Sequence, residues 1–193
     1  MGDGTNYTMF EADGSMQMVG NATVWDDLRI NAGSVDRPGS NDPSFVTYAP
    51  TGSGLSTQLL EFQTGDWASF TVQMPHSYKS NSDIYVHLHW TAGSTANQDS
   101  TVGWKVDYSW ASIGSNFPEM DTAVLTDTVA AGSDIHQMTQ DVKITGTDKG
   151  ISSMLICNVR RTDTGADDTW DETASGSLPM LLEIDFHYEI DIS

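Results

Sequence analysis

Cysteine is almost absent from this chain of 193 residues, which contains only Cys157. A single cysteine excludes an internal disulfide framework, and its place in the apolar run SSMLICNV predicts a buried, small hydrophobic side chain. Long apolar runs are also missing. None approaches the roughly 18 residues of a transmembrane helix, so we predict no membrane partner. The opening segment MGDGTNYTMFEADGS has neither basic residues nor an apolar stretch, so we predict no secretory signal and synthesis in a cytoplasm.

Basic residues are scarce as well: 8 Lys and Arg stand against 27 Asp and Glu, which gives a formal net charge of −19 at pH 7. Nucleic-acid binding relies on clustered Lys and Arg, so we predict no nucleic-acid partner. Apolar residues make up 38% of the chain and charged residues only 18%. A disordered chain does not have this composition, and we expect a folded core.

Apolar residues recur at every second position in several segments, which predicts β-strands bounded by turn residues. In DWASFTVQMP the apolar face carries Ala68 and Phe70, and in IYVHLHWT it alternates with His87 and His89. The segments VGWKVDYSWASIG and PMLLEIDFHYEIDI alternate in the same way, and the latter places Leu182 on the apolar face. Further strands are predicted at residues 22–30, 55–62, 122–128 and 140–144, and the best helix candidate is DIHQMTQ at 134–140.

These strands predict the fold class. The segment ISSMLICNVRR is apolar on both faces from Met154 to Val159, which is typical of a central strand with both faces covered. About eight or nine strands with long polar loops and one core favour an all-β fold, a two-sheet antiparallel sandwich that is jelly-roll-like. We predict an N-terminal arm at residues 1–20 that contacts a neighbouring subunit, and a single β-sandwich domain at 21–193.

The histidines of IYVHLHW are candidate metal ligands. His87 and His89 project from the same face of a strand, so both can ligate one ion. Other residues that can complete such a site are His76, His187, Asp185 and Glu189. His and carboxylate residues also pair across strands on an ordinary polar sheet face, and this is the interpretation that we favour. A third interpretation is a pH-responsive contact between subunits. We therefore predict no cofactor.

An acidic loop, TDTGADDTWDE, is a second candidate metal site. Its carboxylates Asp163, Asp167, Asp168 and Asp171 are hard oxygen ligands of the kind that calcium prefers. The loop lacks the ordered D-x-D-x-D-G start of an EF-hand, so a solvated acidic loop is the favoured interpretation.

Motifs of catalysis are missing. The chain has no G-x-S-x-G, P-loop or H-E-x-x-H sequence, and its many acids single out no glycosidase pair, so we predict that it is not an enzyme. Trp67 lies on the polar face of its strand and Trp170 lies in the acidic loop. Exposed aromatic rings stack on sugars or anchor protein interfaces, so both are candidate interface residues. For Trp170 we favour the simpler role of anchoring its loop.

Three segments resemble a family of virion-associated proteins of tailed bacteriophages. They are FTVQMPHSYKSNSDIYVHLHW, VGWKVDYSWASIGSNFP and DFHYEIDIS, which together cover about a third of the chain. The family pattern is a Pro-His pair, then His-x-His-Trp, then a closing His-Tyr strand. The matching positions are Pro75, His76, Tyr78, Asp83, His87, His89, Trp90, His187 and Tyr188.

This resemblance implies a structural protein of a bacteriophage particle, located in the virion and made in the host cytoplasm, with no catalytic residue carried over. Within it we predict a capsid decoration (cement) protein that acts by protein contacts, forms a homotrimer and binds the phage capsid or another virion protein. The alternative is a tail or head-fibre module, or a carbohydrate-binding β-sandwich that depends on calcium. The resemblance also implies that His76 and Tyr78 determine the fold or an interface.

Overall fold

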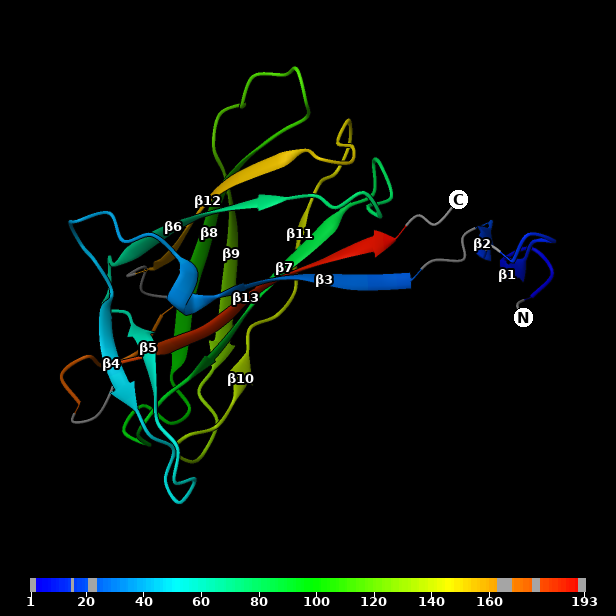
Figure 1. Ribbon diagram of the computed structural model, residues 1–193. Coiled ribbons are helices and arrows are strands. Elements are labelled where there is room, and N and C mark those ends of the chain that lie inside the picture. Colours follow the sequence, from blue (N-terminus) through cyan, green and yellow to red (C-terminus); the bar gives the residue numbers. More distant parts are fainter. Residues whose placement is uncertain (1–2, 15, 21–23, 163–167, 175–177, 191–193) are drawn as a thin grey trace.

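The computed structural model describes the chain except for residues 1–2, 15, 21–23, 163–167, 175–177 and 191–193. Its strands alternate with turns along the whole chain (Figure 1). They are β1 Tyr7–Phe10, β2 Met16–Val19, β3 Val24–Asn31, β4 Ser44–Tyr48, β5 Thr57–Glu61, β6 Trp67–Gln73, β7 Ile84–Thr91, β8 Thr101–Ala111, β9 Asp121–Thr128, β10 Gln137–Met138, β11 Val142–Ile144, β12 Met154–Arg161 and β13 Met180–Ile190. One 3-10 turn, η1, covers Ala32–Ser34.

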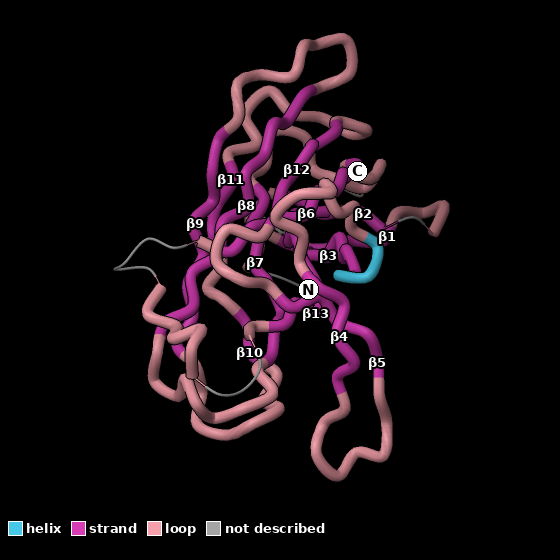
Figure 2. Tube along the Cα trace, turned by 90° about the vertical axis from the view of Figure 1, so that its left-hand side faces the viewer, coloured by secondary structure: helices cyan, strands magenta, loops and turns pink. Residues whose placement is uncertain are grey.

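Two antiparallel sheets form the body. The larger sheet has seven strands in the order β10-β7-β13-β5-β4, with β11 also paired to β7 and β3 also paired to β13. The smaller sheet has four strands in the order β6-β12-β8-β9. Figure 2 shows the two groups of strands in a view turned from that of Figure 1. The predicted all-β, two-sheet antiparallel sandwich with jelly-roll-like character is therefore confirmed.

The core lies between the two sheets and follows the alternation of the sequence. From β7, the side chains of Ile84, Val86, Leu88 and Trp90 are fully buried. From the facing sheet, Trp104 and its neighbours on β8 and β12 fill the same cluster. Because successive side chains of a strand point to opposite faces, burial of the apolar set of β7 turns Tyr85, His87 and His89 to the outer face of the larger sheet.

Three local predictions are wrong. Strand β12 is central, between β6 and β8, but Ile156 is 48% exposed, so only its inner face is covered by described residues. The segment 134–140 is not helical, because Gln137 and Met138 pair with β7 as β10. Leu182 falls at a register shift of β13, a bulge that takes it out of the alternation and leaves Leu181 in the core.

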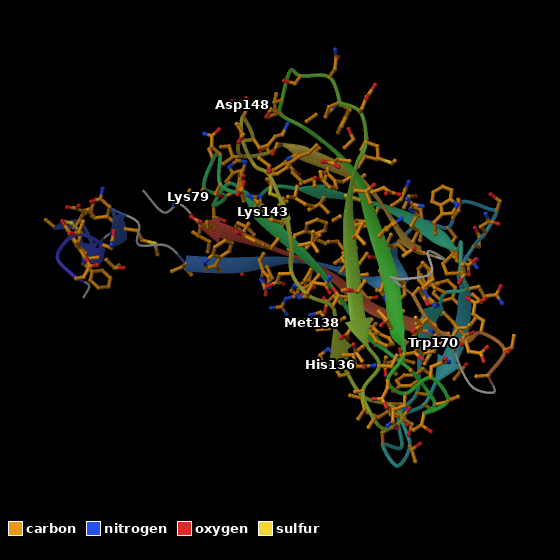
Figure 3. The ribbon with its side chains drawn as sticks, turned by 180° about the vertical axis from the view of Figure 1, so that it is seen from behind. Lys79, His136, Met138, Lys143, Asp148 and Trp170 are labelled. Atoms are coloured by element: carbon orange, nitrogen blue, oxygen red, sulfur yellow. The ribbon has the colours of Figure 1, made fainter. Side chains whose placement is uncertain are left out.

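The N-terminal strands β1 and β2 form a separate antiparallel hairpin, with Tyr7 opposite Val19. In Figures 1 and 3 this hairpin stands apart from the body of the sandwich. None of the hairpin side chains that the structure describes belongs to the core cluster, and Phe10 is 76% exposed. No helix in the described part of the chain could cross a membrane.

Candidate metal centre

The outer face of the larger sheet gathers histidines and carboxylates by strand register. His87 on β7 lies opposite Asp185 on β13. On the other side of β7, strand β11 begins with Val142 opposite Val86, which brings the preceding residue, Asp141, beside His87. His187 also lies on β13, two residues after Asp185, so the side chains of His187 and Asp185 point to the same face of the sheet.

The first group of donors is His87, His89 and Asp185. The two Nε2 atoms of the histidines are 3.1 Å apart. Asp185 Oδ2 lies 3.3 Å from His89 Nε2 and 3.7 Å from His87 Nε2. Tetrahedral zinc holds nitrogen ligands at about 2.0–2.1 Å, which places two ligand atoms about 3.3 Å apart. The three donor atoms therefore lie at about the distances from one another that the ligands of a tetrahedral zinc ion have. The triad fits such an ion.

The second group shares His87 and adds Asp141 and His187. Asp141 Oδ1 is 3.0 Å from His87 Nδ1 and 3.9 Å from His187 Nε2. The donor atoms of each group lie within 4.8 Å of one another. His87 thus presents Nε2 to the first group and Nδ1 to the second.

Partners outside the two groups orient the other histidines. Asp27 Oδ1 contacts His187 Nδ1, which leaves Nε2 of that ring for the second group. His136 Nε2 is 2.8 Å from His89 Nδ1, which leaves Nε2 of His89 for the first group. Figure 3 shows His136 next to Met138 of β10. Such outer contacts fix the tautomer and the ring orientation of metal-ligating histidines.

Burial sets the electrostatics of the cluster. His87 is 2% exposed and Asp185 is 5% exposed, so both side chains are buried although they lie on the outer face of the sheet. His87 Nδ1 and Asp185 Oδ1 have no aligned hydrogen-bond partner among the described residues, although Asp141 Oδ1 is close to the former. Burial above all, and then the charges of His187 and His89, lower the pKa of His87. Its ring is therefore neutral near pH 7, the form that ligates metals.

Two surface hollows give solvent access to the cluster. One lies beside the second group and is lined by Trp25, Tyr85, Asp141 and His187. The other lies beside the first group and is lined by Arg29, His89, His136, Leu182, Glu183 and Asp185. An ion can therefore reach either group without unfolding of the sheet.

The other predicted ligands lie elsewhere. His76 is exposed and outside both groups, and Glu189 forms an ion pair of 2.6 Å with Lys79. Asp163 and Asp167 of the acidic loop lie outside the described residues. Asp168 is buried in an ion pair with Arg161.

Asp171 accepts hydrogen bonds from the backbone N–H and the hydroxyl of Thr173, which lower the pKa of its carboxyl group. Asp168 and Asp171 therefore both have partners within the protein, and these contacts hold the described half of the loop in place.

The candidate interface aromatics are mostly internal. Trp170 is buried, with its ring edge-on to Trp90 and the Arg161 guanidinium 5.6 Å from its centroid. Tyr78 is buried and donates a hydrogen bond to the carbonyl oxygen of Ser82. Neither ring is available to a partner, because the core and the loops of this chain already cover them. Trp67 is half-buried.

Sequence reasoning missed His136, Asp141 and Asp27 as members of the cluster. Their only sequence signal is residue type, because they come from β3 and from the segment before β11, and only strand pairing brings these segments to β7 and β13.

Comparison with known proteins identifies no family. No protein-family model and no curated protein sequence matches the chain. Solved structures share its architecture at low similarity. The CBM35 from Cellvibrio japonicus Abf62 has 11% identity and a TM-score of 0.43, with 83% of this chain and 92% of that chain covered. The enzymatically active domain of bacteriophage CBA120 tailspike protein 4 has 10% identity and a TM-score of 0.34, with 86% and 19% covered.

The stem and receptor-binding domain of the spike protein P1 from bacteriophage PM2 has 8% identity and a TM-score of 0.29, with 86% and 96% covered. The structural neighbours thus include carbohydrate-binding modules and phage spike proteins. None of these likenesses identifies a ligand, a partner or an activity for this chain.

Proposed function

We propose that this chain is a non-catalytic β-sandwich protein that binds a divalent transition-metal ion through His87, His89 and Asp185. The observation that carries the proposal is the set of three donor atoms 3.1, 3.3 and 3.7 Å apart around one point. On an ordinary polar sheet face, each histidine pairs with one carboxylate across the strands. Such pairing does not explain why two imidazole nitrogens converge on each other and on the same oxygen.

The donor set selects the kind of ion. Imidazole nitrogen with one carboxylate oxygen suits zinc, copper or nickel, whereas calcium and magnesium take mainly oxygen ligands. The ion has a structural role in this proposal, because its ligands join β7 to β13 on the outer face of the larger sheet.

Isothermal titration calorimetry tests this proposal. Chelator-treated protein titrated with zinc should bind with a dissociation constant below about 1 μM, equivalent to about 8 kcal/mol. His89→Gln should weaken binding by at least tenfold, because it removes one of three ligands. His76→Gln, the same substitution at an exposed histidine outside the cluster, should bind as the wild type does. Equal binding by all three proteins would refute the proposed site.

The N-terminal hairpin favours a second function. We propose that the chain is a structural component of a bacteriophage particle, a capsid decoration protein that assembles as a homotrimer and contacts the capsid. A two-stranded hairpin is marginally stable alone in water, and β1 and β2 stand apart from the body with Phe10 exposed. A neighbouring subunit would supply the missing apolar surface. The resemblance to virion-associated phage proteins supports this proposal.

A tail or head-fibre position is the alternative within the same class. A carbohydrate-binding module is the other alternative, but Trp170 is buried and cannot stack on a sugar. Multi-angle light scattering of the full chain and of a form starting at residue 24 tests assembly through the N-terminal hairpin. The full chain should be a trimer and the shortened form a monomer with an unchanged circular dichroism spectrum of the sandwich. A full chain that is monomeric at micromolar concentration would refute assembly through the arm.

A further inference from the structure

Among the residues that the structure describes, His87 differs from His89 and His187 in having no partner outside the two ligand groups. His89 and His187 each use Nδ1 for an outer contact, with His136 and Asp27 respectively. His87 instead directs Nε2 to His89 and Asp185, and Nδ1 to Asp141. The two nitrogens of an imidazole ring point away from each other, so a single ion cannot bind both.

We propose that His87 bridges two divalent metal ions. The first ion takes His87 Nε2, His89 Nε2 and Asp185 Oδ2, and the second takes His87 Nδ1, Asp141 Oδ1 and His187 Nε2. This inference rests on the proposed metal-binding function and adds the second ion, its ligands and the bridge.

A single-ion centre would leave Asp141 as a hydrogen-bond acceptor for His87 Nδ1. The distance of 3.0 Å suits such a bond, but the alignment does not, and His87 Nδ1 has no aligned acceptor among the described residues. A single-ion centre also gives no role to His187 Nε2, which lies 3.9 Å from the same carboxylate oxygen while Asp27 holds the opposite nitrogen. A second ion uses Asp141 and His187 together.

Charge balance is favourable for the bridged centre. Binding of the second ion displaces the proton of His87 Nδ1 to solvent, and the ring becomes an imidazolate that donates an electron pair from each nitrogen. Two divalent ions then face the carboxylates of Asp141 and Asp185 and this imidazolate. The net charge of −19 on the chain adds a general attraction for cations.

The two positions differ in exposure. The side chain of Asp141 is 50% exposed and lines a hollow with Trp25 and Tyr85, whereas Asp185 is buried. The second ion therefore keeps solvent-facing positions and should bind more weakly than the first. We expect two resolved binding steps.

Native mass spectrometry of the full chain with added zinc counts the ions. The wild type and the His76→Gln control should each bind two. Asp141→Asn changes an exposed side chain and should bind one, as should His187→Gln. One ion in the saturated wild type would overturn the bridge and leave the proposed function intact. A wild type that binds no ion at all would refute both the bridge and the proposed function.

Copper(II) provides the test of the bridge itself. With two copper(II) ions per chain, an imidazolate bridge couples the unpaired electrons, so the electron paramagnetic resonance signal should fall far below that of two isolated ions. In Asp141→Asn, a single uncoupled copper signal should appear at full intensity for one ion. Two ions with the full intensity of two isolated centres would show that His87 does not bridge.

Discussion

Metal binding should raise the thermal stability of the sandwich, and His87→Gln should reduce this rise to about half or less. His87 belongs to both donor groups, so its loss removes a ligand of every proposed ion. One ion that binds only the folded state stabilises it by about 2.7 kcal/mol at a free concentration 100 times its dissociation constant. For a domain of 150–250 residues, about 1 kcal/mol shifts Tm by about 2–4 °C, so the expected rise is roughly 5–11 °C.

Differential scanning calorimetry of chelator-treated protein, with and without zinc, measures this shift. The wild type and His76→Gln should both show it, because His76 is exposed and lies outside the cluster. The His87→Gln protein should show about half of this rise or less, because a tenfold loss of affinity leaves about 1.4 kcal/mol of stabilisation at the same zinc concentration. A wild-type Tm that zinc leaves unchanged, or an equal rise in His87→Gln, would show that zinc does not bind the folded protein through His87.

Three further predictions concern the body of the sandwich. Burial raises the pKa of the Cys157 thiol, so it should react with a disulfide reagent at pH 8 only after denaturation, and rapid reaction in the folded state would contradict its burial. Asp168→Ala removes the nearer of the two carboxylates beside the buried guanidinium of Arg161, the other being Glu172 at 3.9 Å, and should cost about 3–5 kcal/mol in chemical denaturation, whereas a loss below about 1 kcal/mol would contradict the buried pair. Gly146→Ala places a Cβ 1.7 Å from the carbonyl oxygen of Ser82 and should cost at least about 1–3 kcal/mol, and wild-type stability would show that the turn can shift freely.

Most of the fold could be predicted from the sequence, because each strand has a local pattern of alternating apolar residues. The alternation of β7 predicted both the strand and the common face of His87 and His89. Periodicity fails where one residue is inserted, and the bulge at Leu182 is such a case. Periodicity also cannot tell whether an outward apolar residue is covered, so it did not predict the exposure of Ile156.

The candidate site was only partly readable because strand pairing assembles it. Asp185 and His187 were visible as the polar side of a strand, but nothing local places that strand beside β7. His136 lies in the segment 134–140, whose residue pattern favours a short helix, and pairing with β7 overrides this local preference. Asp141 lies in the predicted strand at 140–144, but nothing local places that strand beside β7. Burial of His87 follows from these neighbours and has no signal within its own strand.

A transition-metal ion bound by His87, His89 and Asp185 would be visible directly in a crystal. Anomalous X-ray diffraction at the zinc edge from crystals of zinc-treated protein tests for this ion. We expect a peak at about 2.0–2.2 Å from His87 Nε2, His89 Nε2 and Asp185 Oδ2, which are zinc–ligand distances. A fully zinc-equilibrated crystal with no anomalous peak at these three atoms would contradict the proposed site.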